Sequence, residues 1–263
     1  MEATTDWSAA RVADILLTAE RTRTARTSIQ AEWPELDLDA AYTAQDVALA
    51  DRMSNGERIT GVKLGLTSRA KQQQMGVDVP SVAWLTDAMA LPAGLPVPRG
   101  QLIHPRAEPE IAFVLKRPLT GPGVTAAQAL ASVDKVLGAI EIIDSRYSGF
   151  KFTLADAVAD NNSSGVYVTG PVMRSVDGLD LALEGCLLEV DGHVVDSATG
   201  AAVLGHPAEA LAFAANTLGV RGHTLEAGWT VLTGGMTDAI AVPSGARIAA
   251  HFTSLGSITI AGG

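Results

Sequence analysis

The chain is short of the residues that build several common kinds of site. It has one cysteine, Cys186, among 263 residues, so an internal disulfide and a cysteine-rich zinc site are both excluded. Its five histidines never show the His-x-x-x-His spacing of helical zinc sites. The motifs Gly-x-Ser-x-Gly and Gly-x-Gly-x-x-Gly are absent, which disfavours an α/β-type serine hydrolase and a nicotinamide-dependent enzyme.

Basic residues are also scarce. There are 19 Lys and Arg against 29 Asp and Glu, a formal net charge of -10. Because phosphate contacts need clustered basic side chains, nucleic acid and anionic membranes are unfavourable partners. No apolar run approaches the roughly 18 residues of a membrane span. Residues 1–6 have neither the basic nor the apolar segment of a secretory signal. We therefore expect a cytoplasmic protein.

What the chain does have is a core-forming composition, with 47% apolar and only 18% charged residues. Its length fits one large domain, or a domain with a smaller helical segment. Apolar residues recur at helical spacing after Val12, and Trp33-Pro34 is expected to break that helix. A second helix is expected over 44–53, with Thr43 and Asp46 as an approximate capping box.

From residue 59 onward the pattern favours short strands with a few inserted helices. Thr125 and Gln128 form a capping box that opens a helix toward Val136, and Asp191-Gly192 is typical of a hairpin turn. Expected strands cover 59–66, 107–115, 187–190, 193–195, 229–232, 246–252 and 257–260, and expected helices cover 69–75 and 207–218. The order predicts an α+β fold, with a helical N-terminal region over 1–75 and a β-rich catalytic core over 76–263.

Glu108 and Glu110 are separated by one proline. On a strand, residues i and i+2 lie on the same face, so the two carboxylates would lie close together. Two such charges repel, and one takes up a proton unless a cation lies between them. Carboxylate ligands favour a hard ion such as Mg²⁺, with Mn²⁺ as the alternative. The spacing alone is equally compatible with a solvated strand face.

Glu141 lies in Gly138-Ala-Ile-Glu-Ile-Ile143, a run that we expect to be buried. A lone buried carboxylate is unfavourable unless it is paired or bound to a metal. It could complete a metal site with Glu108 and Glu110, or form a core salt bridge with an arginine such as Arg146.

Lys63 stands between two glycines, just before the start of an expected helix. An ammonium group near free backbone N–H groups suits a carboxylate or an enolate oxygen. Two polar stretches, 158–165 and 233–237, could be pocket walls or simple turns. His104, close to the pair of glutamates, could reach the same site.

Four motifs carry a resemblance to a known family. They are Gly-Val-Lys-Leu-Gly-Leu-Thr-Ser (61–68), His-Pro-Arg-Ala-Glu-Pro-Glu-Ile-Ala-Phe-Val (104–114), Glu-Ile-Ile-Asp-Ser-Arg-Tyr (141–147) and Val-Ala-Asp-Asn-Asn-Ser-Ser (158–164). Together they resemble the hydratase/decarboxylase branch of the fumarylacetoacetate hydrolase superfamily, with matching order and spacing over nearly the whole chain.

The resemblance implies a helical N-terminal part on a mixed β-roll core, as in the C-terminal domain of fumarylacetoacetase. It implies a Mg²⁺ site and a catalytic lysine, with a second catalytic residue and a substrate-binding group beside them. The implied residues are Glu108, Glu110 and Glu141 for the metal, Lys63 and Asp78 for catalysis, and Leu66, Thr67, Ser68 and Ser163 for the substrate.

Two sister activities share these motifs, and both act on intermediates of meta-cleavage degradation of aromatics. One decarboxylates 2-oxo-3-hexenedioate, and the other hydrates 2-hydroxypenta-2,4-dienoate. His104-Pro105, Arg146-Tyr147, His206-Pro207 and the stretch 233–237 favour the decarboxylase, whereas 163–167 favours the hydratase. The decarboxylase is therefore the expected activity and the hydratase the alternative. The resemblance further implies a small dicarboxylate substrate, a homo-oligomer and a complex with a sister hydratase. A non-catalytic scaffold for that hydratase and a hydrolytic relative that cleaves C–C bonds are the remaining alternatives.

Overall fold

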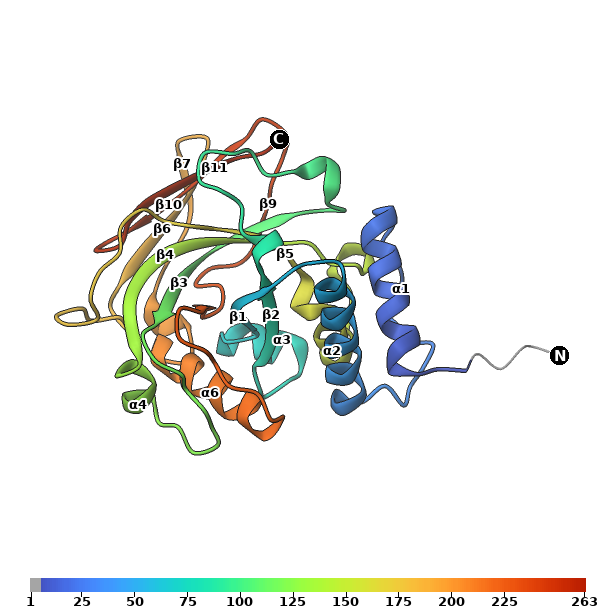
Figure 1. The fold of residues 1–263 in the computed structure, drawn as a ribbon. Coiled ribbons are helices and arrows are strands. Elements are labelled where there is room, and N and C mark those ends of the chain that lie inside the picture. The colour runs from blue at the N-terminus through green and yellow to red at the C-terminus, as the bar shows by residue number, and fades with distance from the viewer. Residues whose placement is uncertain (1–5) are drawn as a thin grey trace.

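The computed structural model describes residues 6–263, so most of the N-terminal stretch considered for a secretory signal lies outside the described residues. A strongly curled mixed sheet is the centre of the molecule (Figure 1). Its strands follow the order β2-β1-β8-β3-β4-β5, and β9 pairs with β3 beyond the short strand β8. Their bounds are β1 (Ile59–Gly65), β2 (Ser81–Thr86), β3 (Arg106–Leu115), β4 (Val133–Ile143), β5 (Ser164–Thr169), β8 (Thr230–Leu232) and β9 (Ile240–Ala241).

A second, antiparallel sheet has the order β11-β10-β6-β7, with β6 (Gly185–Val190), β7 (His193–Thr199), β10 (Arg247–Phe252) and β11 (Gly256–Ala261). The expected hairpin at Asp191-Gly192 is confirmed, because β6 pairs with β7 across it. The principal hydrophobic core joins both sheets to α6 (Pro207–Val220), and Cys186 is one of its members. Burial raises the pKa of the Cys186 thiol to about 12, which suits a core residue.

The N-terminal helices form a separate layer at one side of the molecule (Figure 1). Helices α1 (Ala9–Thr22) and α2 (Leu38–Ser54) pack together, and α2 also packs on α5 (Leu154–Ala159). Their apolar faces form a second hydrophobic cluster around the fully buried Tyr147. Two shorter helices, α3 (Arg69–Met75) and α4 (Ala126–Leu130), complete the set described here. The α+β prediction is thus confirmed.

Several predicted boundaries are wrong for local reasons. The first helix ends at Thr22, where Arg23 adopts a left-handed conformation, well before Trp33-Pro34. The second begins at Leu38, because Asp37 caps it, while the Thr43 hydroxyl donates to a carbonyl inside the helix. The capping box of Thr125 is confirmed, but its helix ends at Leu130, since the chain then enters β4.

Strand β1 lies on the N-terminal side of the predicted boundary at residue 75. It pairs with β2 and β8, so it is part of the main sheet. The division of the chain at residue 75 stays a prediction. Within residues 6–263, no helix is both long and apolar enough to cross a membrane.

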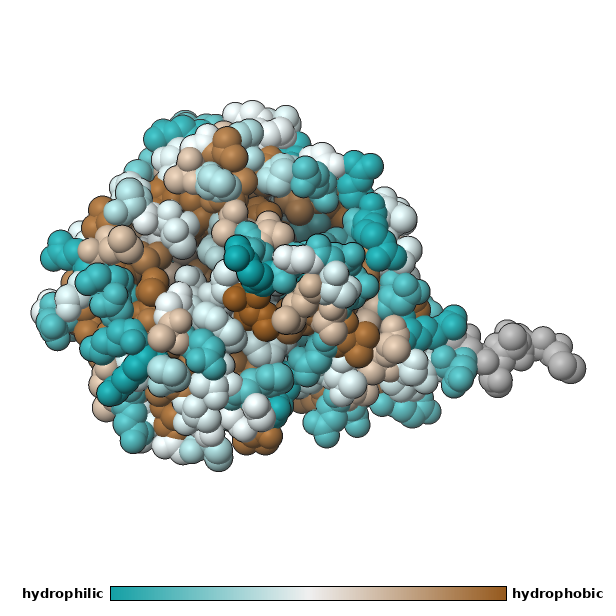
Figure 2. Space-filling view, viewed as in Figure 1, coloured by the Kyte–Doolittle hydropathy of each residue, from teal (hydrophilic) through white to brown (hydrophobic). Residues whose placement is uncertain are grey.

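The surface mixes hydrophilic and hydrophobic residues across the face seen in Figure 2. Most acidic side chains lie at such surface positions, and the buried ones are Glu108, Glu110, Glu141, Asp144, Asp156, Asp160 and Glu184. The acidic excess is therefore mainly solvated, and its buried minority needs a separate explanation.

Asp156 explains how the loop after α1 is held against α5. Its carboxylate accepts hydrogen bonds from the backbone N–H groups of Ile29 (2.9 Å) and Gln30 (3.0 Å) and from the Ser28 hydroxyl. It also completes the capping box with Thr153. A fully buried acceptor of this kind satisfies donors that otherwise have no partner.

We expect Asp156→Ala to lower the free energy of unfolding by about 3 kcal/mol or more, since it leaves several buried donors unpaired. Urea denaturation followed by circular dichroism measures this. The exposed Asp14 of α1 supplies the control, and Asp14→Ala should change stability by about 0.5 kcal/mol or less. Equal effects of the two substitutions would refute the role of Asp156.

Candidate active site and metal centre

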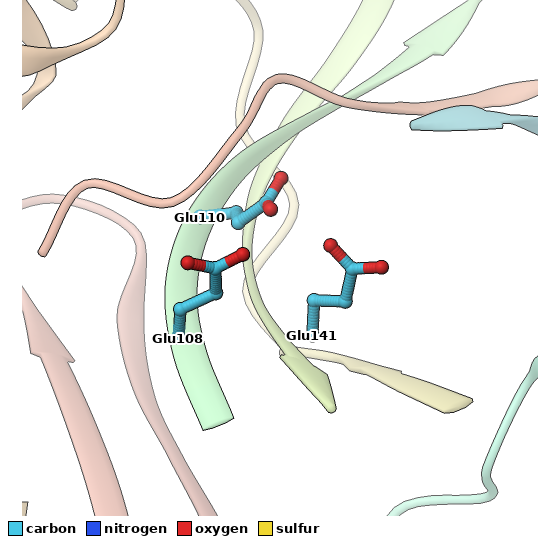
Figure 3. Close-up of side chains that lie close together, drawn as sticks. All are labelled: Glu108, Glu110 and Glu141. Carbon is cyan, nitrogen blue, oxygen red and sulfur yellow. The ribbon is translucent and has the colours of Figure 1, made fainter. Parts of the chain in front are cut away.

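The three glutamates identified in the sequence meet on one face of the β3–β4 pair. Glu108 and Glu110 lie two residues apart on β3, and Glu141 on β4 is the direct cross-strand partner of Glu108. Their carboxylates extend toward a common centre (Figure 3). One oxygen of each lies within 4.8 Å of the others. The prediction that these side chains share a face is confirmed.

All three carboxylates are buried, with exposed fractions of 7% for Glu108, 0% for Glu110 and 2% for Glu141. Burial, followed by the charges of Glu141 and Glu108, raises the pKa of Glu110 well above its usual value. Burial also raises the pKa of Glu141, although Lys63 opposes the shift. Like charges placed directly opposite each other destabilise a sheet, so this arrangement needs a proton or a cation.

Lys63 supplies one positive charge. Its Nζ lies 2.7 Å from Glu141 Oε1 and donates to the carbonyl oxygen of Asn162 at 2.7 Å. The alternative salt bridge from Glu141 to Arg146 is wrong. The Arg146 guanidinium instead binds the Asp160 carboxylate and the carbonyl oxygens of Asp144 and Ser164.

A second lysine, which the sequence did not indicate, contacts the other end of the cluster. Lys71 on α3 lies 2.8 Å from Glu108 Oε2. Although burial opposes it, the Glu108 carboxylate raises the pKa of Lys71. Three carboxylates and two ammonium groups leave a formal charge of -1, so the cluster is still short of positive charge.

Glycines let the backbone reach this cluster. Gly234 donates its N–H to Glu110 Oε2 at 2.7 Å, with a φ of 105° that disfavours other residues. At Gly235 an added Cβ would lie 2.2 Å from Glu108 Oε2. Any larger residue there would displace the carboxylate. The stretch 233–237 therefore packs directly against the acids rather than forming a simple turn.

The residual hydrogen-bonding capacity of the acids fits a metal ion. Oε1 of Glu110 and Oε2 of Glu141 are buried and accept from no group that the structure describes. Other buried acids are satisfied: Asp144 accepts from the backbone of Ile103 and His104, and Glu184 from that of Ser254 and Leu255. Oxygen donors aimed at one centre suit a hard divalent cation.

The cluster borders a cavity of about 360 Å³. Of the residues predicted from the sequence, Lys63, Leu66, Glu108 and Ser163 line it. Leu66 has a φ of 58°, which costs free energy for a residue with a side chain and is characteristic of functional sites. This volume is at the lower end of the range typical of small-molecule sites.

The turn 161–163 forms another part of the cavity wall. Asn161, Asn162 and Ser163 all have φ between 48° and 57°. Hydrogen bonds hold this strained turn, because Asn161 bonds to the backbone of Trp84 and Asn162 accepts from Ser81. Asn162 Nδ2 is buried and has no acceptor in the described part of the chain. Because Asn162 also lines the cavity, its amide is a donor for a ligand.

Other predicted residues lie outside the lining. Thr67 is buried behind Gly234, and Ser68 is the N-cap residue of α3 without a side-chain cap bond. Asp78 is exposed. His104 packs against Phe150, with ring centroids 4.7 Å apart. Phe150 lines the cavity, but His104 does not. Substrate binding by Thr67 and Ser68 and catalysis by Asp78 stay predictions.

Arg106, Phe150 and Asp238 also line the cavity and were not identified from the sequence. Arg106 could have been found, since it continues the i, i+2 series of Glu108 and Glu110. Phe150 ends a short 3-10 helix after motif 141–147, and Asp238 follows the stretch 233–237. Neither has a strand or helix periodicity that would place its side chain in the cavity.

Comparison with known proteins places this site in context. The model of the fumarylacetoacetate (FAA) hydrolase C-terminal family matches residues 58–260. A 4-oxalocrotonate decarboxylase of Pseudomonas putida is 44% identical over 228 residues, covering 87% of this chain and 86% of that protein. A 2-hydroxyhexa-2,4-dienoate hydratase of Comamonas testosteroni is 39% identical over 245 residues, covering 92% and 93%.

Among solved structures, a 4-oxalocrotonate decarboxylase from Pseudomonas putida G7, complexed with magnesium and adipate, has a TM-score of 0.93. It is 39% identical, with 96% of each chain covered. A fumarylpyruvate hydrolase from Pseudomonas aeruginosa has a TM-score of 0.59 at 17% identity, which shows a shared fold alone.

Mg²⁺ at about 100 times its dissociation constant should raise the melting temperature of the protein by roughly 5–10 °C, because a ligand of the folded state stabilises it. Glu108→Gln should lose most of this shift, since one charged ligand is gone. Differential scanning fluorimetry measures it. The exposed Glu209 gives a control, and Glu209→Gln should keep the full shift. An undiminished shift in Glu108→Gln would contradict the metal site.

In chelator, we expect Glu110→Gln to be more stable than the wild type at pH 8, with the advantage shrinking toward pH 5. The folded pKa of Glu110 is raised, so its contribution to stability is present at low pH and is lost as pH rises through that value. Glutamine stays neutral throughout. Urea denaturation at both pH values measures this, and a pH-independent difference would refute it.

Proposed function

Because the chain belongs to the fumarylacetoacetate hydrolase family, we propose that it is a metal-dependent carbon–carbon lyase that decarboxylates 2-oxo-3-hexenedioate (4-oxalocrotonate). The products are 2-hydroxypenta-2,4-dienoate and CO2, within meta-cleavage degradation of aromatics. One observation carries the proposal. It is the buried set Glu108, Glu110 and Glu141, with two unpaired oxygens, beside Lys63 at a cavity of small-molecule size.

The three glutamates would hold Mg²⁺, the ion bound by the decarboxylase of known structure, and Mn²⁺ has the same ligand preferences. The bound ion would supply Lewis acidity for negative charge that develops on the 2-oxo oxygen. With a divalent ion bound, the three glutamates, Lys63 and Lys71 would have a total formal charge of +1, which attracts an anionic substrate.

The reaction breaks the bond between C5 and C6 and releases C6 as CO2. The electron pair forms a C4–C5 double bond, the C3–C4 π pair shifts to C2–C3, and the charge reaches the 2-oxo oxygen. That oxygen then takes up one proton from solvent to give the 2-hydroxy group of the product. Lys63, buried and positively charged, is placed to donate a hydrogen bond to that oxygen or to the C1 carboxylate. The cavity walls at Leu66 and Ser163 would bind the carbon chain. Thr67 and Ser68, next to Leu66 in the chain, are the further proposed substrate-binding residues.

Hydration of 2-hydroxypenta-2,4-dienoate is the second candidate. The 39% identity to the Comamonas testosteroni hydratase, over 93% of that protein, supports it. Hydration uses the same electron sink but adds water at the far carbon, which requires a general acid or base near it. Asp78 is the proposed candidate for such a catalytic group.

Two further parts of the proposal concern the setting of the enzyme. We propose that it acts in the cytoplasm, as a homo-oligomer that associates with a sister hydratase. The exposed apolar residues on and near the small sheet, Leu183, Leu187, Val194 and Val195, are compatible with subunit contacts. Gel filtration with light scattering tests the oligomeric state.

Purified protein with Mg²⁺ and 2-oxo-3-hexenedioate should release CO2. Lys63→Met and Glu108→Gln should each lower kcat by about 100-fold or more, because each removes charge stabilisation from the reacting group. The exposed Lys116 provides a control, and Lys116→Met should stay fully active. Loss of 2-hydroxypentadienoate absorbance without CO2 release would favour the hydratase. Failure of calorimetry to detect Mg²⁺ binding would favour the non-catalytic scaffold.

A further inference from the structure

Arg106 continues the row of side chains that forms the acidic cluster. Arg106, Glu108 and Glu110 are alternate residues of β3, so their side chains leave the same face of the strand. Arg106 pairs with Ile143 of β4 on one side and with Ala241 of β9 on the other. Its backbone is therefore fixed about 7 Å from that of Glu108.

Arg106 also differs in its charge balance from the other cations of the cavity. Lys63 and Lys71 lie within 2.8 Å of glutamate oxygens. The Arg106 guanidinium has no hydrogen bond or ion pair with any residue whose side chain the structure describes. It lies over the Phe150 ring, 4.3 Å from its centroid. Stacking of this kind uses the face of the guanidinium and leaves its N–H edge free.

The surroundings do not neutralise this charge. Asp238 also lines the cavity, but its side chain is exposed and lies beyond salt-bridge distance of Arg106. The half-buried position of Arg106 weakens solvent screening, which strengthens its attraction for an anion. An unpaired guanidinium facing a cavity is therefore suited to a carboxylate, which it can bind through two parallel hydrogen bonds.

We propose that Arg106 binds the distal carboxylate of the substrate and selects a dicarboxylate. This inference rests on the proposed function. The spacing of about 7 Å along β3 is close to the length of an extended six-carbon chain. One carboxylate and the 2-oxo group can then lie at the glutamates while the other carboxylate reaches Arg106. Adipate, the ligand of the similar decarboxylase, is also a six-carbon dicarboxylate.

This pairing has a kinetic signature. The distal carboxylate leaves as uncharged CO2, so its interaction with Arg106 is stronger in the bound substrate than in the transition state. Removal of Arg106 should then raise KM for 2-oxo-3-hexenedioate and leave kcat unchanged or higher. The product lacks this carboxylate, so Arg106 does not hold the product in the site.

The test compares binding of adipate and hexanoate to the magnesium-loaded protein by calorimetry. The wild type should bind adipate at least about tenfold more tightly, because a charge-assisted pair contributes roughly that factor or more. Arg106→Met should weaken adipate binding by about 10–100-fold and change hexanoate binding by less than about twofold. Arg106→Lys, which keeps the charge, should retain part of the preference.

Arg69, exposed at the start of α3, is the matched control, and Arg69→Met should behave as the wild type. Circular dichroism confirms that each variant is folded. If Arg106→Met leaves the ratio of the adipate and hexanoate affinities unchanged, whether or not both become weaker, the assignment is overturned. The affinity ratio is measured without turnover. A wild type that releases no CO2 would therefore refute the proposed reaction, whereas the affinity ratio alone decides whether Arg106 binds the distal carboxylate.

Discussion

Three carboxylates buried beside one another on two paired strands are the constraint around which this structure is organised. Glu108 and Glu141 face each other across β3 and β4, and Glu110 follows at the next position on the same face. Repulsion between them is relieved by Lys63, Lys71 and the backbone of a glycine loop, but two oxygens remain unpaired. The other buried acids described here accept hydrogen bonds from protein groups, so this cluster alone among them has the properties expected of a cation site.

Two backbone segments, the glycine loop at 234–235 and the turn 161–163, pack around the acids and Lys63. Gly234 and Gly235 bring a loop into contact with the acids, where any side chain would collide. In another part of the cavity wall, the strained turn 161–163 places the carbonyl of Asn162 against Lys63. Arg146 anchors this turn, because its guanidinium pairs with the Asp160 carboxylate and donates to the carbonyl oxygens of Asp160 and Ser164 on either side of it. Strain at the cavity is thus supported by hydrogen bonds outside it.

Much of this arrangement could be predicted because it depends on local rules. Alternation along a strand puts Glu108 and Glu110 on one face, and a buried run around Glu141 demands a partner for its charge. The predictions of helix length failed where a local signal competed with the sheet. The capping box of Thr125 starts its helix as expected, yet pairing of Val133 with β3 ends it early. Strand β2 was missed, although it provides the edge of the main sheet.

The sequence by itself determined the family, the α+β class, the three acids and the lysine, because these depend on residue type and on spacing within single segments. Only the tertiary structure decided that Glu141 pairs with Lys63 rather than Arg146, and that Lys71 meets Glu108. It also decided that Arg106 lies over Phe150, without a hydrogen bond or ion pair to any side chain that the structure describes. The physical reason is that such partners come from segments separated by tens of residues. Strand register and helix packing, rather than sequence spacing, fix which charges meet.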